Sequence, residues 1–108
     1  GREGFDRMIT KVIDNASHFF RLINNDEDFI SSVEPELSSV VFALKDGDEV
    51  NRKVRRMLLE KGTVIGQTVK DGKVMLKFTL LNPNLEKEDF PPIISEIKKC
   101  RDKVKEEM

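Results

Sequence analysis

The sequence predicts an α+β domain in the order helix, strand, strand, helix, strand, strand, helix, with a mainly antiparallel sheet and helices packed mostly on one face. Three patterns predict this class: helical periodicity at the start, a tight-turn dipeptide between two alternating apolar runs, and helical periodicity again at the end. The 108 residues fit one domain, spanning 1–108, and leave no room for the large sheet that most cofactor enzymes need.

The first predicted element is a long amphipathic helix. Apolar residues recur at spacings of three and four from Phe5 to Ile23, which is the pattern of one helical face held for five turns. Asn24, Asn25 and Asp26 follow, and short polar side chains of this kind bond to the local backbone and favour a turn. We therefore expect the helix to end there.

Two strands are predicted next. Residues Phe29 to Val33 suit a short strand, which Pro35 interrupts because proline lacks the amide proton of a central ladder. Ser38 to Leu44 is rich in β-branched and aromatic residues, as buried strands are.

A second helix is predicted after Gly47. Asp48 stands where an N-cap belongs, and Gly62 supplies a C-terminal stop. The residues between them form an apolar stripe at helical spacing: Val50, Val54, Met57 and Leu58.

An antiparallel hairpin follows, because residues 64–69 and 73–81 flank Asp71-Gly72, a pair that tolerates the positive φ angles of a two-residue turn. Strand side chains alternate between faces, so the second strand, which we expect to be central, has two distinct sides. Its core side is predicted to carry Val74, Leu76, Phe78 and Leu80, and its other side Met75, Lys77, Thr79 and Leu81.

The last element is a helix that follows the strand exit Asn82-Pro83-Asn84. Pro91 and Pro92 complicate its start, because proline is comfortable only in a first helical turn. Either the regular helix begins near Phe90, which we expect, or a distorted turn from Glu86 precedes it. The residues predicted to point inward are Ile93, Ile94, Ile97, Cys100 and Val104.

The sheet face opposite the helices, which includes Lys77, is expected to be either exposed or covered by protein outside this chain. The composition argues against two classes of binding partner, nucleic acids and membranes. The formal charge of −1 argues against nucleic acid, and no apolar run approaches the ~20 residues that span a bilayer, so we expect no membrane association and a cytoplasmic protein. One cysteine and one histidine predict neither an internal disulfide nor a metal site.

Several other residues could have a functional role, but a purely structural role is expected for each. The basic cluster of Arg52, Lys53, Arg55 and Arg56 is expected to be the solvated face of its helix, although it could bind an acidic partner. His18 is expected at the surface or boundary, and Cys100 in the core. Gly66 is expected to mark a bulge or a close approach of another backbone. Glycine-rich phosphate loops and the Gly-x-Ser-x-Gly motif are absent from the sequence.

The segment from Gly72 to Pro83, GKVMLKFTLLNP, resembles the last long strand and Asn-Pro exit of the group II pyridoxal-phosphate-dependent decarboxylases. Supporting segments occur in the family's order: Gly4-Phe5 with its helix, the VVFAL strand, the helix from Asn51 to Leu59, and the GTVIGQT run from Gly62. The family includes glutamate, aromatic-amino-acid and L-2,4-diaminobutyrate decarboxylases, and the sequence is most similar to the diaminobutyrate branch. The part it resembles is the C-terminal small domain of the PLP-dependent transferase fold.

This resemblance implies a homodimeric lyase, a carboxy-lyase of amino-acid metabolism, that uses pyridoxal phosphate (PLP). It places the cofactor and the catalytic residues in a large domain that this chain lacks, so no catalytic residue is assigned here and the chain alone is expected to be inactive. Relatives usually carry an Arg on the last strand, where its fork binds the substrate carboxylate. This sequence has Lys77 instead, which lacks the planar fork and leaves the amino-acid substrate open. The alternative without a binding role is that Lys77 is a solvated or salt-bridged lysine on the strand surface.

Two alternatives remain, and the first is from a different functional class. A stand-alone interaction or small-ligand regulatory module is compatible with an α/β domain of this size, because fold does not dictate function. The small domain of a PLP-dependent aminotransferase would differ only in the reaction.

Overall fold

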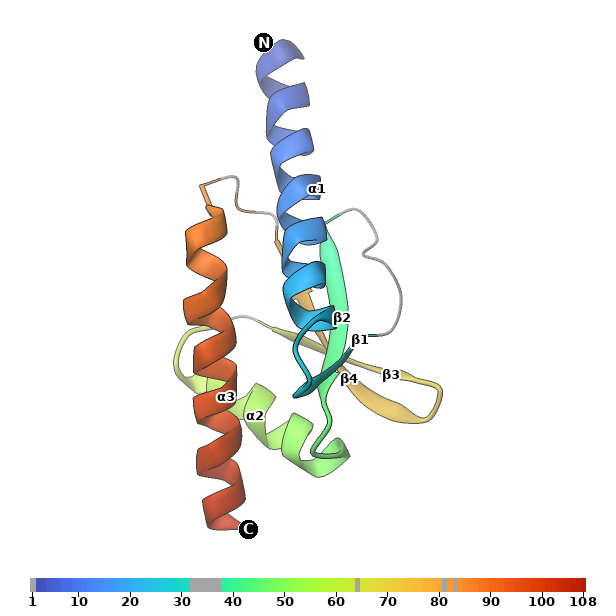
Figure 1. The fold of residues 1–108 in the computed structure, drawn as a ribbon, viewed down its shortest axis with the longest axis vertical. Coiled ribbons are helices and arrows are strands. Elements are labelled where there is room, and N and C mark those ends of the chain that lie inside the picture. Colours follow the sequence, from blue (N-terminus) through green and yellow to red (C-terminus); the bar gives the residue numbers. More distant parts are fainter. Residues whose placement is uncertain (1, 32–37, 64, 81, 83) are drawn as a thin grey trace.

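The computed structural model describes residues 2–31, 38–63, 65–80, 82 and 84–108. Its elements follow the predicted order (Figure 1). The four strands form one antiparallel sheet in the order β1-β2-β4-β3, which confirms the α+β class. The elements are α1 (Arg2–Asn24), β1 (Phe29–Ser31), β2 (Ser39–Leu44), α2 (Asp48–Glu60), β3 (Gly66–Lys70), β4 (Lys73–Thr79), a 3-10 turn η1 (Lys87–Asp89) and α3 (Phe90–Glu107).

The first two predicted elements are present. Helix α1 ends at Asn24, as its polar tripeptide predicted, and β1 begins at Phe29. Strand β1 stops at Ser31, and the predicted continuation to Val33 and Pro35 lies outside the described residues.

The β3–β4 hairpin turns at Asp71 and Gly72, whose φ angles are +52° and +76°. Two positive φ angles are those of the tight hairpin turn predicted for this dipeptide. The register then runs without a break to the pair Gly66–Lys77, so the bulge, one of the two expectations for Gly66, is absent. Strand β4 ends at Thr79, two residues before the predicted end.

Helix α2 begins differently from the prediction, because Gly47 and not Asp48 occupies the N-cap position. Gly47 has a φ of +102°, a conformation that suits glycine. The Asp48 carboxylate accepts a hydrogen bond from the backbone amide of Val74, at 3.0 Å, and so joins the start of α2 to β4. Gly62 has a φ of +91° just past the helix and acts as the predicted stop.

Helix α3 begins at Phe90 with both prolines in its first turn, as expected. The 3-10 turn η1 precedes it, and the Asp89 carboxylate accepts a hydrogen bond from the Glu86 amide at 2.8 Å. None of the helices in the described ranges is both long and apolar enough for a membrane crossing.

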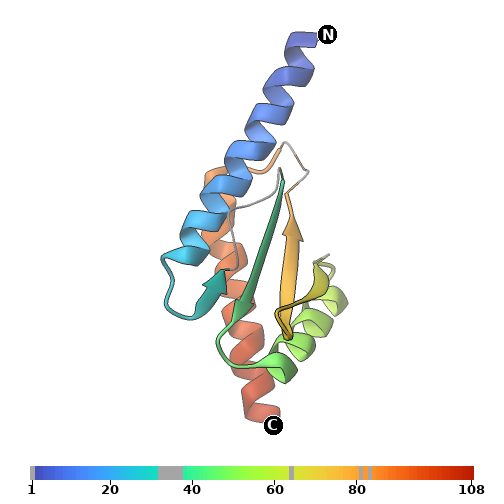
Figure 2. The same cartoon turned by 90° about the vertical axis from the view of Figure 1, so that its right-hand side faces the viewer.

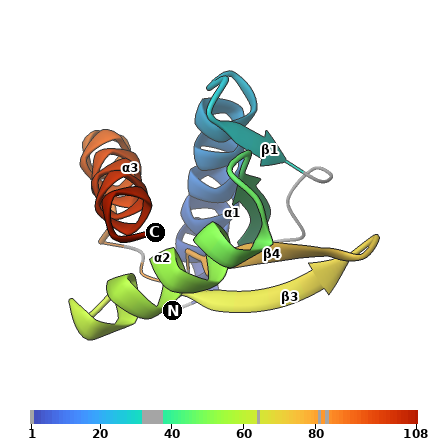
Figure 3. The same ribbon diagram turned by 90° about the horizontal axis from the view of Figure 1, so that it is seen from below.

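All three helices pack against one side of the twisted sheet (Figure 3). The ring of Phe19 on α1 lies 5.2–5.8 Å from those of Phe42, Phe78 and Phe90, so one aromatic cluster joins α1, β2, β4 and α3. Helix α3 runs behind the sheet in Figure 2.

We call the opposite side the outer face; the ladder registers place on it Ile30, Ser39, Val41, Ala43, Gly66, Thr68, Met75, Lys77 and Thr79. Lys77 and Thr79 are exposed there, as predicted. Met75 is 4% exposed and Ala43 is similarly buried, so the expectation that Met75 is either exposed or covered by protein outside the chain is wrong. The outer face is therefore neither sealed by the helices nor uniformly polar.

Candidate functional site

Lys77, the sequence-predicted substrate contact, lies near the middle of the outer face. It pairs with Val41 of β2 on one side and with Gly66 of β3 on the other. Its neighbours along β4, Leu76 and Phe78, are buried in the core and fix the strand from behind. Alternation along a central strand therefore directs the Lys77 side chain away from the helices and toward solvent.

The partner residue Gly66 leaves space beside Lys77. A Cβ added to Gly66 would lie 3.6 Å from the Lys77 Cβ and 3.5 Å from its carbonyl oxygen, which is ordinary van der Waals contact. Any larger side chain at this position would extend along the Lys77 stem. Glycine keeps one flank of the lysine open to a ligand or a protein surface.

The ammonium group of Lys77 makes no ion pair or hydrogen bond with another described residue. Other lysines of the chain do: Lys61 lies 2.8 Å from Glu96, and Lys105 lies 2.9 Å from Asp46. Within the described ranges, the salt-bridged interpretation of Lys77 is therefore not supported. Three N–H donors remain available to a carboxylate.

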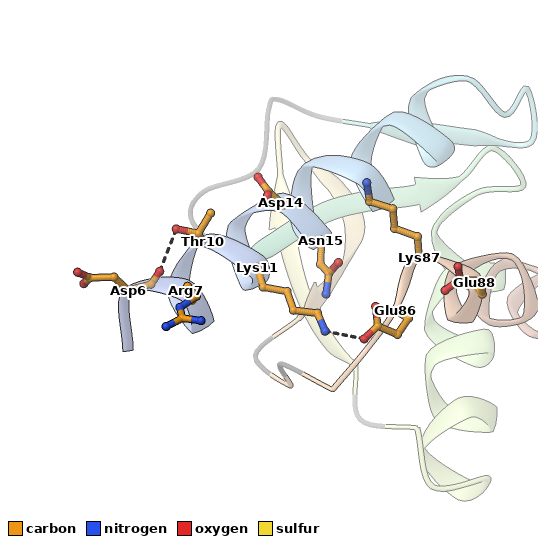
Figure 4. Close-up of a pocket in the computed structure, with 9 residues that line it drawn as sticks. All are labelled: Asp6, Arg7, Thr10, Lys11, Asp14, Asn15, Glu86, Lys87 and Glu88. Carbon is orange, nitrogen blue, oxygen red and sulfur yellow. Dashed lines mark hydrogen bonds and ion pairs between the residues drawn. The ribbon is translucent and has the colours of Figure 1, made fainter. Parts of the chain in front are cut away.

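An open cleft lies elsewhere, between α1 and the segment before α3 (Figure 4). It is an open hollow of about 420 Å³. The Lys11 ammonium contacts the Glu86 carboxylate at 2.6 Å, and Asn15, which is buried, donates to the Leu85 carbonyl at 2.9 Å. These bonds fasten the segment to the helix. The lining residues are Asp6, Arg7, Thr10, Lys11, Asp14, Asn15, Glu86, Lys87 and Glu88.

The carboxylates of this cleft outnumber its cations by four to three. It contains no His or Cys that could serve as base or nucleophile. A smaller apolar hollow of about 200 Å³ lies between α2 and α3, with Phe78 and Ile97 in its lining and Glu96 beside them. In the part of the chain that the structure describes, no group of three His, Cys, Asp or Glu side chains could hold a metal ion.

The basic residues of α2 have the structural role expected of them, and nothing in their contacts with other described residues indicates a binding site. Arg52 and Arg56 are exposed, Lys53 pairs with Glu49 at 3.3 Å, and Arg55 donates to the Ile65 carbonyl at 3.0 Å. The cluster is thus the polar face of α2.

His18 is half-buried with its ring 5.7 Å from that of Phe90, and burial lowers its pKa, helped by the nearby charges of Lys87 and Arg21. Cys100 is fully buried, and this burial raises the pKa of its thiol. Neither residue lies on the outer face.

The apolar face of α1 is covered by the domain in one half of the helix and exposed in the other, which its sequence periodicity did not indicate. The apolar positions from Phe19 to Ile23 are covered by the domain, whereas Phe5 is 57% exposed and Met8 and Ile9 about 40% exposed. The covered and the exposed half have the same spacing of apolar residues, so the sequence pattern does not distinguish them.

No family model matches this sequence. The L-2,4-diaminobutyrate decarboxylase of Rhizobium meliloti (strain 1021) is 32% identical over 90 residues, which cover 77% of this chain and 18% of that protein. Among solved structures, the glutamate decarboxylase domain of diaminobutyrate-pyruvate transaminase and L-2,4-diaminobutyrate decarboxylase from Vibrio parahaemolyticus matches with a TM-score of 0.85 and 33% identity, covering 90% of this chain and 22% of that one.

The Oryza sativa protein TDC, solved with PLP, has a TM-score of 0.84 at 22% identity and covers 96% of this chain and 24% of its own. At that identity the likeness shows a shared fold. This chain spans about a fifth of the length of the proteins it matches.

Proposed function

Because this chain belongs to the group II pyridoxal-phosphate-dependent decarboxylase family, we propose that it is the C-terminal small domain of an amino-acid decarboxylase, and that it helps to close the substrate cleft of the complete enzyme. The complete protein would release the α-carboxylate of an amino acid as carbon dioxide. It would act as a cytoplasmic homodimer, with the cofactor held by a large domain outside residues 1–108. This chain alone would be inactive.

The observation that carries this proposal is Lys77 on the outer face, whose ammonium has no partner among the residues that the structure describes. A lysine within the described residues that lacks a carboxylate partner, with Gly66 open beside it, is suited to bind an anion supplied from outside the chain. The outer face also presents apolar Val41 and exposed Ile30, so another protein surface could cover it.

We propose that Lys77 binds the substrate carboxylate when the outer face covers the cleft. An ammonium supplies charge and three movable donors, whereas the arginine usual in the family would supply two parallel bonds. Lysine therefore holds the carboxylate with less control over its orientation. Lys77 would position the substrate and would take no part in proton transfer.

Neither the cleft beside α1 nor the apolar hollow between α2 and α3 fits PLP itself. The phosphate of PLP needs amide or cationic donors, and its aldehyde needs a lysine in an enclosed slot. The larger cleft is open and has an excess of carboxylates, and no lysine lines the apolar one. PLP supplies an electron sink for carbanion chemistry when it is bound. We assign its binding to the proposed large domain.

The direct test uses the complete protein that contains these residues. We expect it to show the visible absorbance of bound PLP and to release carbon dioxide from L-2,4-diaminobutyrate or glutamate, while the isolated 108-residue chain does neither. Amino-group transfer to a keto acid without carbon dioxide release would favour the aminotransferase alternative. A complete protein that binds no PLP would contradict the proposal and favour an interaction module.

A further inference from the structure

The first half of α1 projects from the domain as a single helix. It extends beyond the other elements in Figure 1, and residues 2–10 are all exposed. The second half of the same helix is anchored in the core by Ala16, Phe19 and Ile23. The chain therefore presents several helical turns whose side chains are not covered by the domain.

The projecting half carries an uncovered apolar stripe, which we call the α1 stripe: Phe5, Met8, Ile9 and Ile13. These side chains are 57%, 41%, 40% and 36% exposed. They continue, at spacings of three and four, the face that is buried farther along the helix. A helical segment of about ten residues is marginal in water without packing of its apolar face. The stripe has the composition of a buried face but is uncovered in this chain.

We propose that the α1 stripe docks against an apolar surface of the cofactor domain, and so anchors the small domain to it. This inference rests on the proposed function, which places this chain beside such a domain. The chain spans only about a fifth of the length of the proteins it matches, so most of such a protein remains to supply the surface. The outer face would then cover the cleft, while the α1 stripe provides the attachment.

The area of the stripe favours this occupant over a second copy of the chain. Four side chains with these exposures present on the order of 400 Å² of apolar surface. A stable interface between separate proteins buries roughly 800 Å² on each partner. A linked domain needs less area, because the covalent connection raises the effective concentration of the two surfaces.

The stripe contains a natural probe in Met8. Hydrogen peroxide oxidises accessible methionine to the sulfoxide, and peptide mass spectrometry follows each residue separately. Met75, which is 4% exposed, is an internal buried reference, and free methionine in the sample calibrates the reagent. We expect Met8 to react readily in the isolated chain and about tenfold more slowly in the complete protein. Equal reactivity in the two proteins would overturn the docking.

A variant pair gives a second readout. Phe5→Ser with Ile9→Ser removes two of the four apolar side chains of the α1 stripe and keeps Met8. Val69→Ser is the matched control, because Val69 is an apolar residue 65% exposed on edge strand β3. In the complete protein, the stripe variant should lower the melting temperature by a few degrees and restore the reactivity of Met8, whereas Val69→Ser should do neither. In the isolated chain, the stripe variant should unfold close to the wild-type midpoint.

Three further outcomes separate the hypotheses. If the isolated chain dimerises in sedimentation equilibrium and the stripe variant is monomeric, the occupant is a second copy and the docking proposal is wrong. If the complete protein releases carbon dioxide while Met8 stays reactive, the docking fails although the proposed function stands. Protection of Met8 in a complete protein that binds no PLP would show that another part of the protein covers the stripe, and it would overturn both the decarboxylase assignment and the cofactor domain as the occupant.

Discussion

The side-chain amide of Asn51 on α2 bonds to both backbone groups of Leu44 at the end of β2. Its Oδ1 accepts from the Leu44 amide at 2.9 Å, and its Nδ2 donates to the Leu44 carbonyl at 3.0 Å. The same Nδ2 donates to the Gly47 carbonyl at 2.8 Å. Asn51 is 1% exposed, so this buried amide takes the place of a strand partner and joins the sheet to the helix.

Replacing Asn51 by Ala should destabilise the chain by about 2–3 kcal/mol, because buried Leu44 backbone groups would lose their partners. Urea unfolding followed by circular dichroism measures this loss. Asn51→Asp should also destabilise, since a carboxylate cannot donate to Leu44. The control is Asn25→Ala, at an exposed turn residue, for which we expect less than about 0.5 kcal/mol. Equal effects at the two positions would contradict the bridging role.

The elements that the sequence predicted well are those determined by local apolar periodicity and by the residues that favour a tight turn. The α1 pattern gave the helix and its end at Asn24, and Asp71-Gly72 gave the hairpin and its register, because a two-residue turn determines which residues pair. Alternation then placed Lys77 on the outer face. Each of these features depends on residues close together in the chain.

The features that sequence missed depend on contacts between distant segments. Asp48 looks like an N-cap, but its carboxylate bonds to Val74, 26 residues away. Asn51 looked like an ordinary helix residue, and only the position of Leu44 makes it a buried bridge. Periodicity likewise cannot tell which half of an apolar stripe is covered, since that depends on where the sheet ends.

The ion pairs of Asp28 predict a loss of stability in acid. Hydrogen bonds from Lys98, and then from Arg101, lower the pKa of the Asp28 carboxyl below its usual value. A carboxyl with a lowered folded pKa adds stability above its unfolded pKa of about 3.9, and this stability is lost as the pH falls through the folded pKa. The Asp28→Asn variant should therefore be less stable than wild type at pH 6, and the difference should shrink below about pH 4.

Urea unfolding of both proteins between pH 6 and pH 2.5 measures this difference. Glu27→Gln is the matched control, because Glu27 is an exposed neighbour without an ion pair among the described residues. Its difference from wild type should stay small throughout. A difference for Asp28→Asn that did not change with pH would show that the carboxylate charge contributes nothing.

The Cys100 thiol should be inert in the folded chain. It is fully buried on α3, and burial raises its pKa although Lys61 acts in the opposite direction. Since the thiolate is the reactive form, a disulfide reagent such as Ellman's should label Cys100 only when the domain opens. We expect fast labelling in 6 M guanidinium and labelling at least about a hundredfold slower in buffer. Rapid labelling in buffer would contradict the core position of the thiol.

Lys77 gives the prediction that most directly tests the candidate site, and it concerns the complete enzyme. If its ammonium binds the substrate carboxylate, Lys77→Ala should lower kcat/KM about 10- to 100-fold, the loss of one charge-assisted hydrogen bond. The urea midpoint should hardly change, because the side chain is exposed and has no partner among the described residues. Lys77→Arg should retain most of the activity, since it keeps the charge and adds the planar fork of the guanidinium.

Lys73→Ala, on the same strand and the same face, is the matched control and should leave kcat/KM unchanged. If Lys77→Ala and Lys73→Ala have the same kinetics as the wild type, Lys77 is a solvated lysine, and the outer face would have to close the cleft without binding the substrate.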